Sequence, residues 1–289
     1  MPATPLPPLH VGDITVTIFN SGDLRHFLRD SLDLPASAWQ GRYDDALFGD
    51  WIPVPVQCAL IQTPSATVLV DAPSADLGEE SDLSVPGYTP PPDLLRQLAS
   101  LRVDPSDITH IVITHTHFDH FNGLADIHTA SPRANYPQAQ LLIGRADWEA
   151  QAQAEGFAQG TSPSAQMLQP YASAGRLQLV DAPVELAPTV TVIPSPSETR
   201  GHLSVRVQSQ GTTFYCIGDV YHHWVEVENR DWMVGWADHD LTVAEREKLE
   251  PTALAEDARL MASHINGIGR LVRAGDGVRW EDIPLAAAQ

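Results

Sequence analysis

The residues of this chain that could do chemistry gather at positions 114–120, where the sequence is Thr-His-Thr-His-Phe-Asp-His. Four candidate metal ligands follow a mostly apolar run directly: His115, His117, Asp119 and His120. Neutral imidazoles and carboxylates suit Zn, Fe, Mn or Co, and four such groups are more than one open metal site takes. Histidines also occur in cores and on surfaces without any ligand role, but this density favours metal binding. The cluster therefore predicts two adjacent metal ions.

Further motifs along the chain resemble the metallo-β-lactamase superfamily. The pattern His-x-His-x-Asp-His, with Asn122-Gly123 behind it, resembles the metal-binding signature of that family. Residues 66–71 resemble its first motif, a strand that ends in a structural Asp. Gly218-Asp219 resembles the segment whose Asp bridges the two metals, and Ser263-His264 resembles the last ligand strand. The resemblance covers about residues 9–283 and implies an α/β (α+β) fold, a four-layer αββα sandwich, which we expect as a single domain over residues 1–289.

One family ligand is replaced in this chain. The family usually carries Gly-His-Thr-Pro-Gly-His before a strand, and its first His binds metal, whereas residues 197–202 here are Ser-Glu-Thr-Arg-Gly-His. Aligning Gly201-His202 with the second Gly-His places Glu198 at the ligand position, 21 residues before Asp219. The resemblance thus favours Glu198. The alternative ligand is His202, which would otherwise support the site from outside the ligand set, and Glu198 could also be a solvated loop carboxylate.

The resemblance then implies two divalent metal ions per chain, each in its own ligand set. The first set would be His115, His117 and Glu198. The second would be His120, Asp219 and His264, with Asp219 bridging and Asp119 also ligating. Zn suits both sets, and the carboxylate of Glu198 also suits Fe or Mn in the first. Three carboxylates and a bridging hydroxide would balance two divalent ions, so a neutral site should favour uncharged esters or lactones over anionic substrates.

The expected reaction is hydrolysis by a dinuclear centre, in which the bridging hydroxide attacks the carbonyl of a neutral ester or lactone. Asp119 would pass a proton to the leaving alcohol. Tyr221 could donate a hydrogen bond to the developing oxyanion, or it could simply pack in the core. The residues expected to line the substrate pocket are Phe118, His222, His223 and Ile265. Residues 222–232 resemble the lactonase and methyl-parathion-hydrolase-like branch of the family.

Other functions remain open on the same fold. One is a mononuclear iron oxidoreductase like the persulfide dioxygenases of this superfamily, and β-lactamase or phosphotriesterase activity could be the main or a side reaction. A binding protein without turnover is disfavoured because every ligand position is filled. Metal content separates these classes, since they require two metals, one iron or none.

Composition limits the kinds of molecule that this chain is expected to bind. The chain has 17 basic and 37 acidic residues and a formal charge of −20, which argues against nuclease activity and nucleic-acid binding. Its first residues lack the pattern of a signal peptide and no apolar run reaches membrane-spanning length, so we expect a cytoplasmic enzyme with a small-molecule substrate and no membrane partner. Cys58 and Cys216 lie singly in apolar runs and are expected to be buried thiols.

Periodicity predicts the elements that must position these residues. Strands are expected at 11–19, 54–62, 67–71, 140–144, 177–180, 189–193, 203–209 and 212–217. Helices are expected at 93–101, at 145–155, and from a capping box at Thr242, with Pro251 kinking or shortening that last helix. Residues 21–53, rich in Asp and aromatic residues, are long for a plain connection and predict a lid over the pocket or a contact in a homodimer.

Overall fold

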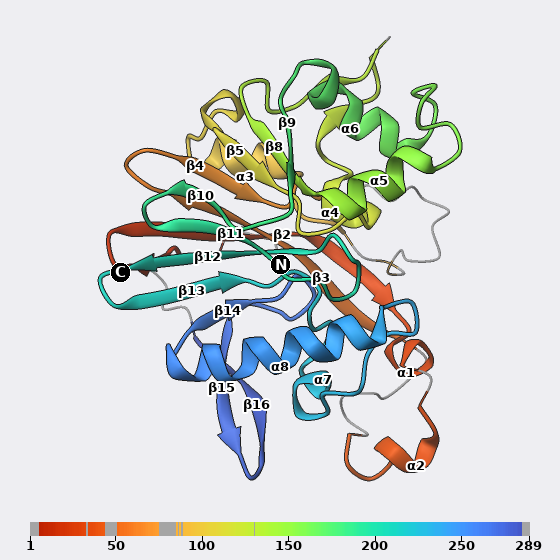
Figure 1. Cartoon of the computed structure of the whole chain (residues 1–289), viewed down its shortest axis with the longest axis vertical. Coiled ribbons are helices and arrows are strands. Elements are labelled where there is room, and N and C mark those ends of the chain that lie inside the picture. Colours follow the sequence, from red (N-terminus) through yellow and green to blue (C-terminus); the bar gives the residue numbers. More distant parts are fainter. Residues whose placement is uncertain are drawn as a thin grey trace.

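A computed structural model describes residues 6–32, 34–43, 51–74, 85, 87, 89–129 and 131–284. Over these residues the chain forms two seven-stranded sheets that pack against each other, and helices α6 and α8 lie on opposite sides of the pair (Figure 1). The expected four-layer αββα sandwich is confirmed.

The first sheet provides the parallel strands that lead into the histidine cluster. Its order is β1 (Leu9–Val11), β2 (Ile14–His26), β3 (Ile52–Gln62), β4 (Thr67–Val70), β5 (His110–Val112), β8 (Gln140–Gly144) and β9 (Leu177–Val180). Strands β1 to β4 pair antiparallel, whereas β4, β5, β8 and β9 run parallel. Parallel strands end at the same edge of a sheet, so Asp71 after β4 and the cluster after β5 arrive side by side.

The second sheet brings the remaining motifs to that edge. Its order is β10 (Val184–Ala187), β11 (Val190–Pro194), β12 (Leu203–Ser209), β13 (Thr212–Cys216), β14 (Arg259–Met261), β15 (Gly269–Ala274) and β16 (Gly277–Asp282). The turn at Gln210 and Gly211 has positive φ at both residues, 49° and 79°, which confirms the predicted hairpin. Strands β13 and β14 are parallel neighbours. A separate small sheet pairs β6 (Ala125–Asp126) with β7 (Arg133–Ala134).

The helices cover the outer faces of the sheets. They are α1 (Leu28–Ser31), α2 (Ala36–Trp39), α3 (Leu94–Ser100), α4 (Phe118–Phe121), α5 (Arg145–Gln153), α6 (Pro163–Ser173), α7 (Trp224–Glu228) and α8 (His239–Ala255), with a short 3-10 turn, η1 (Pro105–Asp107). One apolar cluster lies between the two sheets, a second lies under α3 and α6, and a third lies under α8. Both cysteines are buried free thiols, as expected.

Several element predictions were wrong in detail. Helix α8 begins at His239 rather than at Thr242, because the Asp238 carboxylate caps it by accepting a hydrogen bond from the Leu241 amide at 3.3 Å. Pro251 does not end this helix, which continues to Ala255. Helix α3 ends at Ser100, and Leu101, expected as its last residue, is the cap that follows it and is 40% exposed. Hydrophobic periodicity did not predict α6, although the cap at its start, Ser162-Pro163, is a usable signal.

The bounds expected for the insertion, residues 21–53, were too wide. Strand β2 continues to His26 and β3 begins at Ile52, so residues 27–51 join the two strands and carry α1 and α2. Of these residues, Leu32 and Tyr43 pack with Val225 of α7, and the Ser31 carbonyl accepts a hydrogen bond from the Gly235 amide. Residues 33 and 44–50 lie outside the described residues. The lid and the homodimer contact both stay predictions. No described helix is long and apolar enough to cross a bilayer.

Candidate metal centre

The candidate ligands meet where strands of both sheets end. His115 to His120 follow β5, Asp219 lies three residues after the end of β13, and His264 lies three residues after the end of β14. Because β13 and β14 are parallel, Asp219 and His264 reach the same edge of their sheet. Glu198 lies in the loop between β11 and β12.

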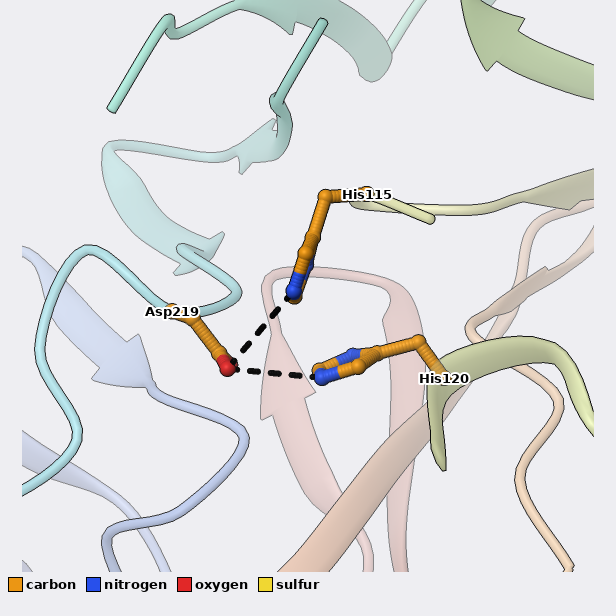
Figure 2. Close-up of side chains that lie close together, drawn as sticks. All are labelled: His115, His120 and Asp219. Carbon is orange, nitrogen blue, oxygen red and sulfur yellow. Dashed lines mark ion pairs between the residues drawn. The ribbon is translucent and has the colours of Figure 1, made fainter. Parts of the chain in front are cut away.

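Asp219 occupies the middle of the cluster. Its Oδ2 lies 3.8 Å from His115 Nε2, 3.4 Å from His120 Nε2 and 3.1 Å from His264 Nε2. Figure 2 shows the carboxylate of Asp219 and the rings of His115 and His120 pointing toward one another. One buried carboxylate therefore contacts imidazoles from both of the expected ligand sets.

Glu198 is buried against the first set, so it is not a solvated loop carboxylate. Its Oε2 lies 3.0 Å from His115 Nε2, and its Oε1 lies 3.3 Å from His117 Nδ1. The indole Nε1 of Trp236 donates a hydrogen bond to Oε1 at 2.6 Å. The structure thus brings Glu198 together with His115 and His117, the arrangement that the alignment favoured.

His202 has both ring nitrogens engaged within the protein. Its Nδ1 lies 3.0 Å from the hydroxyl of Ser195, and its Nε2 accepts a hydrogen bond from the amide of Asp219 at 3.1 Å. Burial, aided by the charge of His115, lowers the pKa of His202 to about 3, so the ring is neutral and can accept this bond. At Gly218 a Cβ would lie only 2.4 Å from the ring, so glycine is needed for this close approach.

Supporting contacts direct the second set inward. Asp119 Oδ2 lies 3.7 Å from His120 Nε2 and 3.5 Å from His264 Nε2. The opposite nitrogen of His120 contacts Asp71 Oδ2 at 3.0 Å, and that of His264 donates to the Pro55 carbonyl at 2.9 Å. Each ring therefore turns its Nε2 toward the centre, as metal-binding histidines do. Asp71 itself has a φ of +62°.

The electrostatics of the cluster fit cations. Burial lowers the pKa of His120, but the charges of Asp219 and Asp119 outweigh it and hold the pKa well above its usual value. Burial raises the pKa of Glu198 and that of Asp219, but the surrounding imidazoles bring both well below the usual range. Among the described residues, three candidate ligands each have a buried side-chain atom without a hydrogen-bond partner: His120 Nε2, Glu198 Oε2 and Asp219 Oδ1. Metal ions would satisfy such a donor set.

In the part of the chain that the structure describes, four overlapping groups of three side chains have ligand atoms within 4.8 Å of one another and could each hold a metal ion. The first two contain His115, joined either by His117 and Glu198 or by His120 and Asp219. The others are Asp119, His120 and His264, and Glu198, Asp219 and His222. The first expected set is one of these groups, whereas the members of the second are divided between two of them. His222, which was expected only in the pocket, joins the fourth group.

A cavity of about 340 Å³ opens over these side chains. Besides cluster residues it is lined by Leu24, Arg25, His26, Val54 and Trp236. None of these residues was predicted from the sequence, because they come from β2, β3 and the loop before α8 and no chemical motif marks them. Of the four expected pocket residues, His222 lines the cavity and the other three do not. Phe118 lines a separate hollow, Ile265 is buried in the core under α8, and His223 caps α7 by accepting from the Val225 amide.

Tyr221 also lies outside this cavity. It is fully buried, its hydroxyl donates to Glu250 Oε1 at 3.1 Å, and the guanidinium of Arg246 lies 4.5 Å from its ring centre. The expected oxyanion role of Tyr221 is therefore not supported by its position, and the alternative of core packing describes it. The next residue, His222, is the one that turns toward the centre.

The comparisons with known proteins agree with this arrangement. A family model for the metallo-beta-lactamase superfamily matches residues 51–243. The chain belongs to the metallo-beta-lactamase superfamily. An N-acyl homoserine lactonase of Bacillus sp is 21% identical over 228 residues, which are 75% of this chain and 83% of that relative. A probable metallo-hydrolase of Mycobacterium tuberculosis is 28% identical over 144 residues, 44% of this chain and 42% of that relative.

Solved structures of this superfamily fold match nearly the whole chain. AidC, a dizinc quorum-quenching lactonase, has a TM-score of 0.79 at 19% identity and covers 98% of both chains. The hydrolase AbOPH has a TM-score of 0.79 at 19% identity, over 99% of this chain and 100% of that one. These likenesses show the fold. Together with the family match and the clustered ligands, they place the chain among the metal-dependent hydrolases of the metallo-beta-lactamase superfamily.

Proposed function

We propose that this hydrolase holds two divalent metal ions and cleaves an uncharged ester or lactone. The observation that carries the proposal is the position of Asp219, whose Oδ2 lies within 3.8 Å of His115, His120 and His264. A carboxylate shared in this way suits a bridge between two ions. The first ion would be held by His115, His117 and Glu198, and the second by Asp119, His120 and His264.

Two bound metals would supply an activated water at neutral pH and a Lewis acid that polarises the carbonyl. The chain itself supplies a proton carrier. Asp119 lines the cavity, and its side chain is 19% exposed, whereas that of Asp219 is 2% exposed and that of Glu198 is fully buried. Asp119 is thus the carboxylate that a substrate in the cavity can reach, and we assign to it the proton that is passed to the leaving alcohol.

The cavity wall supports a substrate with an apolar part. Leu24, Val54 and Trp236 line the same cavity as the candidate ligands. Three carboxylates balance most of the charge of two divalent ions, so the metal centre itself would offer little net attraction to an anion. N-acyl homoserine lactones, the substrates named for the Bacillus relatives, combine an uncharged lactone with an apolar chain and are suitable first candidates.

Two other activities are outcomes of the same test. A β-lactamase or phosphotriesterase would use the same centre on a different acyl or phosphoryl group. A mononuclear iron oxidoreductase would not need the second set, and the meeting of Asp119, His120 and His264 disfavours it.

The test combines metal analysis with a substrate panel. The protein is reconstituted with Zn, Mn or Fe, and metal per chain is counted before hydrolysis is assayed on neutral esters, N-acyl homoserine lactones, a β-lactam, a phosphotriester and a phosphodiester. We expect two metals per chain and turnover of a neutral ester or lactone above the others. One iron per chain without hydrolysis would overturn the proposal, as would two metals with a preference for the phosphodiester.

A further inference from the structure

His222 has an environment that neither the superfamily pattern nor the proposed reaction explains. It follows Asp219 by three residues and is buried, with its ring turned into the centre rather than toward the surface. Its Nε2 lies 3.2 Å from Glu198 Oε1 and 3.3 Å from Asp219 Oδ2. Two carboxylates from different loops therefore converge on one imidazole nitrogen.

The other nitrogen of His222 faces a fixed carboxylate. Its Nδ1 lies 3.9 Å from Glu226 Oε1, and both atoms are buried without a hydrogen-bond partner among the described residues. Glu226 Oε2 accepts hydrogen bonds from Arg246 Nη2 at 2.6 Å and from the His222 amide at 3.3 Å. Arg246 is itself fully buried and also donates to three backbone carbonyls, those of Val220, Arg230 and Trp232. Glu226 is thus anchored on the side of the ring away from the centre.

A neutral imidazole carries one proton, and on Nε2 it would be donated to Glu198 and Asp219. A proton on Nδ1 would be directed at Glu226, and the lone pair of Nε2 would then face the carboxylates of Glu198 and Asp219. Three lone pairs directed at one another in a buried site are unfavourable unless a cation lies between them. A carboxylate behind an imidazole whose far nitrogen binds a metal is the usual outer support of metal-binding histidines.

We propose that His222 is an additional protein ligand of the metal centre, on the ion held by Glu198, and that Glu226 positions it. The inference deepens the proposed function and rests on it. It also accounts for the replacement at position 198, because His222 returns an imidazole to the set in which Glu198 stands where the family carries His. The ion would lie beside Glu198 and Asp219, whose ligand atoms are within 4.8 Å of each other and of a ring nitrogen of His222.

The ring of His222 is packed for one orientation. It stacks on His264 with the ring centres 5.6 Å apart and 8° between the planes, and on His26 at 6.3 Å and 9°. The ring of Trp236 packs edge-on against His222, with the ring centres 6.2 Å apart. Little rotation of the ring is therefore needed, or available, for Nε2 to bind an ion.

The experiment measures metal affinity rather than turnover. Zinc dissociation constants are measured by competition with a chromophoric chelator. The proteins compared are wild type, His222→Ala, His222→Gln, Glu226→Gln and the control His223→Ala. His223 is the matched control because it is the adjacent histidine and its ring caps α7 instead of facing the centre. Thermal unfolding of each metal-free variant separates lost folding from lost binding.

Removal of His222 should lower the affinity for one of the two zinc ions by about 100-fold or more. Glu226→Gln should lower the affinity for the same ion by about 10- to 100-fold, as the loss of a group that supports a ligand typically does. His223→Ala should leave both affinities within about threefold, the scatter expected of a substitution that touches no ligand. A crystal structure of the zinc-loaded wild type should show His222 Nε2 at the Zn–N bond length of about 2.0–2.1 Å.

Unchanged affinities in both His222 variants, or a His222 nitrogen at hydrogen-bonding distance from zinc-bound groups in the crystal, would overturn the assignment of His222. If the His222 variants do not fold, the crystal structure alone decides. Wild type that binds fewer than two metals would instead overturn the proposed function, so the two failures are distinguishable.

Discussion

The replacement of the usual histidine by Glu198 gives the sharpest prediction. Glu198 contacts His115 and His117 through different oxygens, at 3.0 and 3.3 Å. Both ring nitrogens of His202, by contrast, are hydrogen-bonded to the Ser195 hydroxyl and the Asp219 amide. Glu198→Ala should therefore remove a direct ligand of one ion. His202→Ala should only loosen the backbone on which Asp219 sits.

The magnitudes follow from the cost of a ligand. A protein site with four ligands binds zinc with about 10–16 kcal/mol, so one ligand accounts for about 2.5–4 kcal/mol, or about 100- to 1,000-fold in affinity. His202→Ala should cost at most about 10- to 100-fold, because it removes an orienting contact. Only Glu198→Ala should release one ion while the other remains bound.

The assay is zinc and manganese titration with metal counting at each step. Glu198→Gln is the control variant, because its amide oxygen can still accept the hydrogen bond from Trp236 while the negative charge is lost. Glu198→His should bind the ion that Glu198→Ala loses and should shift the metal preference of that site from Mn toward Zn, since imidazole is a softer ligand than carboxylate. If His202→Ala empties the first site while Glu198→Ala leaves it filled, the placement of Glu198 in the ligand set is wrong.

Three further outcomes are expected. Asp71→Ala should lower the free energy of unfolding by about 2–6 kcal/mol in chemical denaturation, because it leaves the amide of Thr114 and the ring of His120 without their buried acceptor; a loss under about 1 kcal/mol would contradict this. Gly144→Ala should lower the melting temperature and the affinity for the first metal, because its Cβ would lie 1.8 Å from a carbonyl oxygen of the loop that carries Glu198. The control Gly277→Ala, whose Cβ would have its nearest neighbour at 3.9 Å, should change neither. Chelation should lower the melting temperature by about 5–10 °C per metal at 100-fold saturation, and zinc should restore it; an unchanged melting temperature after verified metal loss would argue against a metal centre that stabilises the fold.

The sequence by itself was enough to predict the fold, the family and the class of metal-dependent hydrolase. His115 to His120 are consecutive, so no folding was needed to recognise them as one cluster, and the order of the other motifs identified the family resemblance. Strand alternation and the Gln210-Gly211 turn located β2 to β4, β12 and β13 because these are local signals. The start of α8 was missed because two residues, Asp238 and Thr242, offered competing caps and only the folded chain selects between them.

The tertiary structure decided which side chains meet. The sequence could not separate Tyr221 from His222, since neighbouring residues in an irregular loop point in directions set by the backbone path, and one of them entered the core while the other turned to Glu198 and Asp219. The cavity wall was equally hidden, because Leu24, Val54 and Trp236 come together only when β2, β3 and the loop before α8 pack around one opening. Ligand identity is a property of adjacent residues and their spacing, whereas the shape of a pocket depends on contacts between segments far apart in the chain, and those contacts exist only after the two sheets have packed together.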